Sequence, residues 1–501
     1  MKLYEERERE RPDDYFADWK EREALAEGMI PLVGKLYRKN NVKTYIYGHP
    51  LVNRSVIEIM QDHRAVRQIE SNELSEFETF PVLRALAAHD LGHAHIDIGR
   101  ISARYFFEGD NVDADGKAVT LEDYISQQVS TLIGKDEKPL AQPQDVVLYG
   151  FGRIGRLMAR LLIEKTGGGD NLRLRAIVVR NGGEHDLIKR ASLLQRDSVH
   201  GQFNGTVRVD EERCSFIANG NEIRVIYADA PDQIDYTEYG ISNALIVDNT
   251  GMWRDFDGLG LHLKSKGTSK VLLTAPGKGD MKNIVSGIND DIMEDSDSII
   301  SAASCTTNAI TPPLKALDDE YGVESGHVET VHSYTNDQNL IDNFHKGNRR
   351  GRSAALNMVL TETGAVKAVG KVLPHLLGKL SGNAIRVPTP NVSMAILNLT
   401  LKRETTAEDL NEYMRKVSVH SSLRKQIDFT NSPEVVSSDF VGSRRACVFD
   451  AQATITSGKN VVIYIWYDNE FGYSCQVHRV MEKMAGVKYA LYPPNRPSSP
   501  K

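Results

Sequence analysis

Cysteine is scarce in this chain, which has four cysteines in 501 residues: Cys214, Cys305, Cys447 and Cys475. Their spacing shows no pairs of the kind that small secreted domains use to build a disulfide framework. A disulfide-stabilised extracellular protein is therefore excluded, and a reducing compartment, the cytoplasm, is the expected location.

Long apolar runs and an excess of positive charge are missing too. No stretch approaches the ~20 apolar residues that a membrane-spanning helix needs, and the charged first ten residues do not form a secretory signal. The net charge of -7 gives no electrostatic reason to expect nucleic acid or an anionic membrane as a partner. With 41% hydrophobic and 26% charged residues, the chain is typical of a soluble globular protein of two or three domains.

The chain divides into three regions that differ in charge and in hydrophobic periodicity. Residues 1–142 are charged and show helical periodicity, and they end in a polar linker. From residue 143 to about 304, short buried strands alternate with helices, which predicts parallel βαβ units in an open, doubly wound sheet. After residue 305 the apolar runs lengthen and alternate, as expected for a sheet with one covered face. The fold class is therefore α/β: a mainly helical extension, a Rossmann-type domain and an α+β domain.

A glycine pattern marks the first turn of the doubly wound region. Gly150, Gly152 and Gly155 follow the short strand 146–149 and precede a helix. In this context the first glycine allows a tight turn, the second lets the backbone approach a pyrophosphate, and the third permits close packing of helix and strand. The helix N-terminus then offers free N–H groups to the anion. The pattern predicts a dinucleotide site and no metal.

The end of the second strand bears on the choice of cofactor. NAD-selective sites usually place a carboxylate there, whereas this chain has Arg180, Asn181 and two glycines before Glu184. An arginine suits a 2′-phosphate, which favours NADP or the use of both cofactors. In the alternative interpretation Arg180 points to solvent and the glycines direct Glu184 into the ribose site.

A cysteine and a histidine are the candidate catalytic pair. Cys305 follows a predicted strand and opens a helix, where the helix dipole and backbone donors should stabilise a thiolate near neutral pH. His332, in a later strand-like run, could serve as its base. A free cysteine also packs as a small hydrophobe, so a structural role stays open on these residues alone.

Four motifs together resemble the phosphorylating glyceraldehyde-3-phosphate dehydrogenase family: residues 150–155, 304–308, 386–391 and 466–473. The resemblance covers about residues 145–485. It implies an NAD(P)-binding domain over 143–304, a catalytic domain over 305–468, and a C-terminal helix with a tail over 469–501 that returns to the first domain. It also implies a homotetramer that acts in glycolysis or gluconeogenesis.

The resemblance assigns roles to residues by their match to the family's motifs. Cys305 becomes the nucleophile and His332 the base, with a Cys thioester, hydride transfer to the nicotinamide, and phosphorolysis to an acyl phosphate. Substrate and phosphate contacts are implied for Ser304, Thr306, Thr335, Asp337, Arg350, Thr363, Gly364 and Arg386. Cofactor contacts are implied for Gly152, Arg153, Ile154, Gly155, Arg180, Asn181, Thr250, Gly251, Thr274, Asn469 and Tyr473.

Some positions depart from the family, and two other functions stay open. Tyr149 precedes the first glycine where asparagine is common, and residues 343–345 differ beside the expected adenine ribose, so cofactor choice is the least secure assignment. An erythrose-4-phosphate dehydrogenase shares the architecture. A non-catalytic binding protein on the same fold is the other alternative, although the intact Cys305 and His332 oppose it.

The N-terminal extension has no counterpart in the common form of the family. His89, Asp90 and His93 only partly resemble a helical zinc motif, because the carboxylate is short and Gly92 weakens the helix. We expect a polar helix end or turn there. The extension is expected to pack on the enzyme or on a neighbouring subunit.

Overall fold

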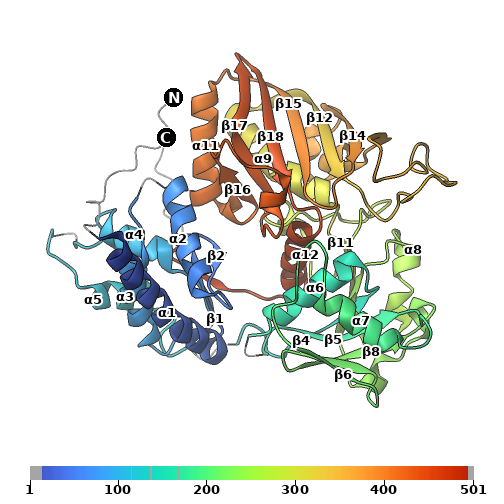
Figure 1. The fold of residues 1–501 in the computed structure, drawn as a ribbon, viewed down its shortest axis with the longest axis horizontal. Coiled ribbons are helices and arrows are strands. Elements are labelled where there is room, and N and C mark those ends of the chain that lie inside the picture. The colour runs from blue at the N-terminus through green and yellow to red at the C-terminus, as the bar shows by residue number, and fades with distance from the viewer. Residues whose placement is uncertain (1–13, 71, 114, 136–137, 168, 495–501) are drawn as a thin grey trace. The chain divides into compact units, whose positions relative to one another are not determined.

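The computed structural model describes residues 14–494, apart from residues 71, 114, 136–137 and 168. Contacts within the chain divide the described residues into two units (Figure 1). The N-terminal unit comprises the described parts of 1–142, 167–171 and 487–501, and the larger unit comprises 143–166 and 172–486. No helix among the described residues is both long enough and apolar enough to cross a bilayer.

The N-terminal unit is mainly helical, as predicted, but it also contains a small sheet that was not expected. Its helices are α1 (Tyr15–Asn40), α2 (Val56–Ile69), α3 (Glu76–Ala87), α4 (Ile98–Phe106) and α5 (Leu121–Gln128). Its strands are β1 (Val42–Ile46), β2 (His49–Pro50), β3 (Ala94–Asp97) and β19 (Ala490–Tyr492), in the order β19-β3-β1-β2. Serine capping boxes begin α2 and α3, and the predicted cap Thr120 begins α5.

The segment that partly resembles a zinc motif lies between α3 and β3, outside any helix. Its side chains have separate partners: His89 contacts the Ser126 hydroxyl at 3.2 Å, and Asp90 accepts hydrogen bonds from Lys39 and Asn40. Within the described part of the chain, no cluster of three or more His, Cys, Asp or Glu side chains could hold a metal ion. The segment is thus a polar turn.

Strand β19 makes the end of the chain part of the N-terminal unit. It pairs in parallel with β3, with Leu491 opposite His95. Just before it, the Tyr489 ring stacks on His95 at 4.1 Å and its hydroxyl lies 3.1 Å from Lys43 Nζ. Ala490 and Tyr492 pack against the buried core of this unit. This strand was not expected from the sequence.

The first part of the larger unit is the predicted doubly wound sheet. Its strand order is β11-β10-β9-β4-β5-β8-β7-β6, and the six strands from β11 to β8 are parallel. The chain proceeds from β4 to one side through β5 and then to the other side through β9, which creates a switch point at the carboxyl ends of β4 and β9. The strands are β4 (Gln144–Tyr149), β5 (Leu172–Val179), β6 (Val207–Asp210), β7 (Ser215–Ala218), β8 (Asn221–Tyr227), β9 (Ala244–Asp248), β10 (Thr268–Leu273) and β11 (Ile299–Ser301). The helices are α6 (Arg153–Glu164), α7 (Asp186–Gln195) and α8 (Phe256–Leu259).

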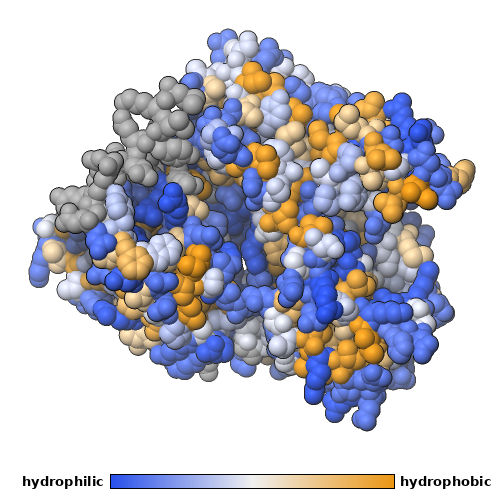
Figure 2. Space-filling model, in the orientation of Figure 1, coloured by the Kyte–Doolittle hydropathy of each residue, from blue (hydrophilic) through white to orange (hydrophobic). Residues whose placement is uncertain are grey.

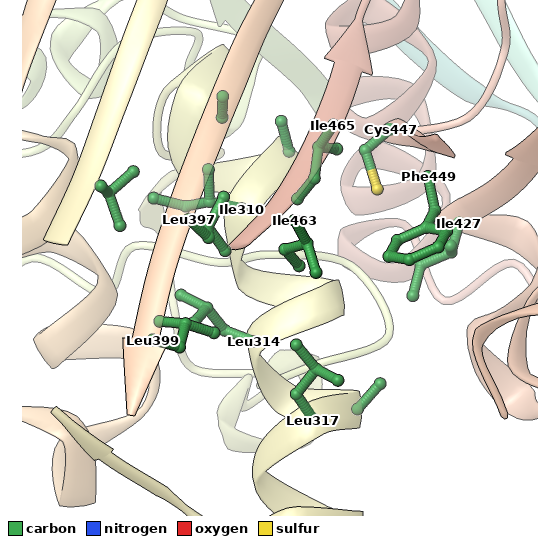
Figure 3. Close-up of a cluster of buried hydrophobic side chains, with 14 of the residues drawn as sticks. Ile310, Leu314, Leu317, Leu397, Leu399, Ile427, Cys447, Phe449, Ile463 and Ile465 are labelled. Atoms are coloured by element: carbon green, nitrogen blue, oxygen red, sulfur yellow. The ribbon is translucent and has the colours of Figure 1, made fainter. Parts of the chain in front are cut away.

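The second part is a mixed sheet packed on helices, which confirms the predicted α/β class. The strand order is β13-β14-β12-β15-β18-β17-β16. The strands are β12 (Val323–Ser333), β13 (Val359–Glu362), β14 (Leu380–Val387), β15 (Ser393–Leu401), β16 (Ile427–Thr430), β17 (Cys447–Ser457) and β18 (Asn460–Tyr467). Figure 3 shows side chains of α9 (Cys305–Tyr321), including Ile310 and Leu314, against Leu397 and Ile463 of the sheet. The other helices are α10 (Ala365–Val372), α11 (Ala407–His420) and α12 (Phe471–Met484).

Helix α12 follows the last strand of the mixed sheet and packs on α6 of the doubly wound sheet, so it ties the two parts of the larger unit together. It ends at Met484, and Gly486, just beyond the C-cap Ala485, has a φ of 75°, a left-handed conformation that favours glycine. The chain then runs directly into the segment that contains β19.

Ending the chain at Gly486 should destabilise the N-terminal unit, because β3 would become an unpaired edge and the core beneath Tyr492 would be exposed. We expect a loss of roughly 2–4 kcal/mol, the scale of removing a packed aromatic side chain, measured by hydrogen exchange at the amides of β1 and β3. A chain that ends at Pro494 is the control and should match the parent. Equal protection in both shortened chains would contradict the structural role of β19.

Candidate active site

The glycine turn after β4 has the geometry of a phosphate cradle. Gly150 has a φ of 94°, and a Cβ on Gly155 would lie 2.3 Å from the Gly150 carbonyl oxygen, so both positions require glycine. Gly152 is the N-cap of α6 with no side-chain cap, and a Cβ built on it would meet nothing within 4 Å. The first N–H groups of α6, including those near Ile154, therefore face open space, and this cradle fits a dinucleotide pyrophosphate.

The Arg153 side chain forms ion pairs with two carboxylates and does not point into the cradle. Its guanidinium donates to Asp197 at 2.6 Å and to Glu470 Oε1 at 2.8 Å. Glu470 also contacts His200 Nε2 at 3.0 Å. Arg153 can thus serve the cradle only through its backbone N–H, while its side chain joins the start of α6 to the residue before α12.

The loops after β9 and β10 reach the same edge of the sheet. Thr250, next to Gly251, donates its backbone N–H and its hydroxyl to Asp248, at 2.8 and 2.7 Å. Thr274 donates to the Asp248 carbonyl oxygen at 3.0 Å. Asp248 is fully buried and lies 3.0 Å from His262 Nε2, which fixes both loops beside the switch point.

Arg180 lies exposed at the end of β5, with its guanidinium 3.7 Å from the sulfur of Met252 in the loop after Thr250. Asn181 accepts the backbone N–H of Gly183 at 2.8 Å. The Glu184 side chain is exposed and contacts His185 at 3.4 Å. The cation, and not the carboxylate, is therefore directed toward the loop after β9.

Cys305 and His332 are brought together from two elements. Ser304 caps α9 by accepting the backbone N–H of Thr307 at 3.0 Å, which places Cys305 in the first position of the helix. His332 lies near the end of β12, and its Nε2 is 3.6 Å from the Cys305 sulfur. The two side chains that the sequence selected are thus neighbours in the fold.

His332 Nδ1 contacts both a hydrogen-bond acceptor and a hydrogen-bond donor, and only the tautomer with a proton on Nδ1 can donate to the acceptor. His332 Nδ1 lies 2.7 Å from the Ser333 carbonyl oxygen, which can only accept a hydrogen bond. Arg386 Nη1 also donates to that carbonyl, at 3.0 Å, and lies 2.7 Å from Nδ1. A proton on Nδ1 leaves the lone pair of Nε2 directed at the thiol.

Burial acts on the pKa values of both members of the pair. Burial raises the pKa of the Cys305 thiol above its ordinary value, and the Thr306 hydroxyl and the Arg386 charge act in the opposite direction. Burial, together with Arg386, lowers the pKa of His332 to about 4. Burial thus opposes the predicted thiolate, while the Thr306 hydroxyl, Arg386 and the backbone donors at the start of α9 favour it.

The other predicted anion-binding residues fall into two groups. After β12, Asp337 accepts hydrogen bonds from Thr335 and Arg350, and Arg350 Nη2 also donates to Thr361 at 3.1 Å. At the start of α10, the Thr363 hydroxyl accepts the Ala365 N–H at 3.2 Å, and Gly364 is the uncapped N-cap. No hydrogen bond found among the described residues joins either group directly to Cys305 or His332.

Two residues predicted to contact the cofactor form hydrogen bonds with residues next to the catalytic elements. Asn469 accepts a hydrogen bond from Ser393 at 2.8 Å, and the Tyr473 hydroxyl donates to the Ala303 carbonyl oxygen at 2.9 Å. The sequence did not single out Tyr467, whose hydroxyl contacts Thr306. Its position inside the motif 466–473 was the available signal.

A dinucleotide cradle and a cysteine–histidine pair on one doubly wound scaffold define the class of nicotinamide-dependent oxidoreductases. Sequence comparison narrows the class. The family model for the NAD-binding domain of glyceraldehyde 3-phosphate dehydrogenase matches residues 144–256, and the model for the C-terminal domain matches residues 304–469. The chain belongs to the glyceraldehyde-3-phosphate dehydrogenase family.

Relatives agree with this placement. A glyceraldehyde-3-phosphate dehydrogenase-like protein of Pseudomonas aeruginosa (strain UCBPP-PA14) is 62% identical over 467 residues, which covers 93% of this chain and 100% of the relative. Glyceraldehyde-3-phosphate dehydrogenase 2 of Bacillus subtilis (strain 168) is 40% identical over 68% of this chain and 96% of its own length. The chloroplastic glyceraldehyde-3-phosphate dehydrogenase A of Zea mays is 40% identical over 72% of this chain and 88% of its own length.

Replacing His332 by Asn should slow the alkylation of Cys305 by iodoacetamide, because the thiol loses its proton acceptor. We expect a decrease of roughly 10²-fold near pH 7, the scale of general base assistance. The rates should converge at high pH, where hydroxide removes the thiol proton in both proteins. Alkylation is followed by mass spectrometry of the Cys305 peptide. A constant rate ratio across the pH range would contradict the role of Nε2.

Proposed function

We propose that this chain is a phosphorylating glyceraldehyde-3-phosphate dehydrogenase. The observation that carries the proposal is the contact of 3.6 Å between the Cys305 sulfur and His332 Nε2, with Arg386 directly behind the imidazole. The thiol can attack an aldehyde while Nε2 takes its proton. The arginine provides positive charge for a phosphorylated substrate.

The reaction begins with proton transfer and attack. As the Cys305 sulfur bonds to the aldehyde carbon, its proton moves to His332 Nε2. The backbone N–H of Cys305, free at the start of α9, and the imidazolium donate to the developing oxyanion. The imidazolium then protonates the oxygen, which gives a hemithioacetal and restores the neutral base.

Acyl formation and release use the same two residues. His332 accepts the hydroxyl proton of the hemithioacetal as the thioester forms on Cys305. A bound nicotinamide dinucleotide supplies the hydride acceptor for this oxidation. An oxygen of inorganic phosphate then attacks the thioester carbon, the C–S bond breaks, and the acyl phosphate departs. The leaving Cys305 sulfur takes the proton that His332 holds, which restores the thiol and the neutral base.

Two sets of residues would hold the two phosphates. We assign the substrate phosphate to Thr335, Asp337, Arg350 and Arg386. Arg386 Nε is buried and has no hydrogen-bond partner among the residues described, so a donor is available there. We assign the attacking phosphate to Ser304, Thr306, Thr363 and Gly364, where the Ala365 N–H bonds to Thr363 and Gly364 offers no side-chain cap to the N–H groups that follow in α10.

We further propose that the enzyme uses NADP, or both cofactors. The direction of the Arg180 side chain toward the loop after β9 supports this, because an arginine there can grip a 2′-phosphate. The exposed position of the Glu184 side chain removes the carboxylate that would select NAD.

We also propose that a second copy of this chain covers part of the larger unit, in a homotetramer. The segment between β12 and β13 exposes apolar side chains, among them Phe344, which is 90% exposed. The others are Leu340, Ile341, Leu356 and Met358. Figure 2 shows apolar side chains gathered on the loop at the upper right, and an exposed cluster of this kind is typical of a subunit interface.

Initial rates with glyceraldehyde 3-phosphate should depend on inorganic phosphate. Without phosphate we expect a burst of about one reduced cofactor per Cys305, followed by slow turnover, because the thioester accumulates. Cys305→Ser should lower turnover by ~10³-fold or more. The same assay with erythrose 4-phosphate identifies the preferred aldehyde. Rapid turnover that ignores phosphate would contradict the proposed phosphorolysis.

Replacing Arg180 by Asp should shift cofactor preference toward NAD. We expect KM for NADP to rise by roughly 10- to 100-fold, the scale of one lost charge-assisted contact, and KM for NAD to stay level or fall. Arg208→Asp, on the exposed edge strand β6, is a control with the same change in charge. Equal KM ratios in the parent and both variants would contradict the role of Arg180.

A further inference from the structure

The phenol of Tyr467 lies at the centre of a buried group of hydroxyls behind the catalytic pair. Tyr467 is the last residue of β18 and is 1% exposed. Its hydroxyl is 2.7 Å from Thr330 Oγ1 and 3.0 Å from Thr306 Oγ1. The Thr306 hydroxyl lies 3.9 Å from the Cys305 sulfur. A chain of three hydroxyls therefore runs from β12 to the nucleophile.

The direction of this chain follows from counting donors. Each hydroxyl has one proton to donate, and a buried donor left without an acceptor is costly. Within the described residues, the hydroxyl of Thr330 contacts only Tyr467, so its proton is donated to the phenol oxygen. The phenol proton then goes to Thr306 Oγ1, and the Thr306 proton is directed away from the phenol, on the side of the Cys305 sulfur.

A neighbouring serine also hydrogen-bonds the Tyr467 phenol. The Ser393 proton is donated to Asn469 Oδ1 at 2.8 Å and its oxygen accepts the Ser333 N–H at 3.1 Å, so toward the phenol Ser393 can only accept. Burial raises the pKa of Tyr467 far above neutral pH, so the phenol keeps its proton. Tyr467 therefore remains a donor throughout turnover.

The ring of Tyr467 has a separate role from its hydroxyl. It packs edge-to-face against the His332 imidazole, with centroids 6.0 Å apart and an interplanar angle of 75°. Phenylalanine keeps this packing and removes only the hydroxyl. The contribution of the hydroxyl can thus be tested without removing the support of the base.

We propose that Tyr467 is a positioning residue for phosphorolysis. By donating to Thr306 Oγ1, it turns the Thr306 proton outward, toward an oxygen of the attacking phosphate. Without the phenol proton, the Thr306 hydroxyl can rotate and present its lone pairs to the anion, which repels it. This inference rests on the proposed function, because it assigns Thr306 to the attacking phosphate.

Tyr467→Phe should raise KM for inorganic phosphate by about tenfold, the scale of a misdirected hydrogen bond to a charged group, in the cofactor-loaded enzyme. The KM values for cofactor and aldehyde, and the burst of cofactor reduction without phosphate, should stay within about twofold, because inorganic phosphate takes no part in these steps. Tyr413→Phe is the matched control, since it also removes one tyrosine hydroxyl, which donates to the Ala316 carbonyl oxygen at 2.8 Å.

A second variant decides the matter if Tyr467→Phe does not fold. Thr330→Val removes the donor that sets the direction of the chain and should raise KM for phosphate by about threefold, with the burst unchanged. Unchanged KM for phosphate in the folded variants, or an equal rise in all three KM values, would overturn the role of Tyr467. A parent enzyme that turns over without phosphate would instead overturn the proposed function.

Discussion

The contact between the Cys305 sulfur and His332 Nε2 is the interaction on which the proposed chemistry depends. The two residues are 27 positions apart and meet because α9 begins where β11 ends, beside the end of β12. The cap on α9 and the carbonyl of Ser333 hold the two side chains in line. Burial disfavours the charged form of both residues.

Much of the scaffold could be predicted from local patterns. The glycine turn at 150–155 and the strand–helix alternation after it are short-range features, and they correctly indicated the doubly wound sheet. The placement of Cys305 at a helix start followed from the strand before it. Such features are predictable because backbone conformation and hydrophobic periodicity act over a few residues.

What could not be predicted depends on contacts between distant residues. The pKa direction of Cys305 is set by burial, which local sequence does not specify. The hydroxyl contacts of Tyr467 join residues 137 and 161 positions apart. Strand β19 pairs with a strand nearly 400 positions earlier, and three residues such as Ala490–Tyr492 carry no periodic signal. These features become visible only in the folded chain.

The participation of β19 changes how the N-terminal unit is understood. One of the four strands of its sheet comes from residues 490–492, far from the rest of the unit in the sequence. The Pseudomonas relative aligns over 93% of this chain, and the match thus includes most of the first 142 residues. Helix α12 begins next to Asn469 and Tyr473 and leads directly into the segment that holds β19. The backbone therefore links this sheet to the candidate cofactor residues.

Arg386 connects the two halves of the proposed reaction. In the free enzyme its charge, added to burial, keeps His332 neutral and ready to accept a proton. A substrate phosphate at Arg386 would offset that charge, and the pKa of the imidazole would rise. His332 would then hold the thiol proton more firmly once a phosphorylated aldehyde is in place. The same arginine that recognises the substrate would thus strengthen the base only when an aldehyde is there to be attacked.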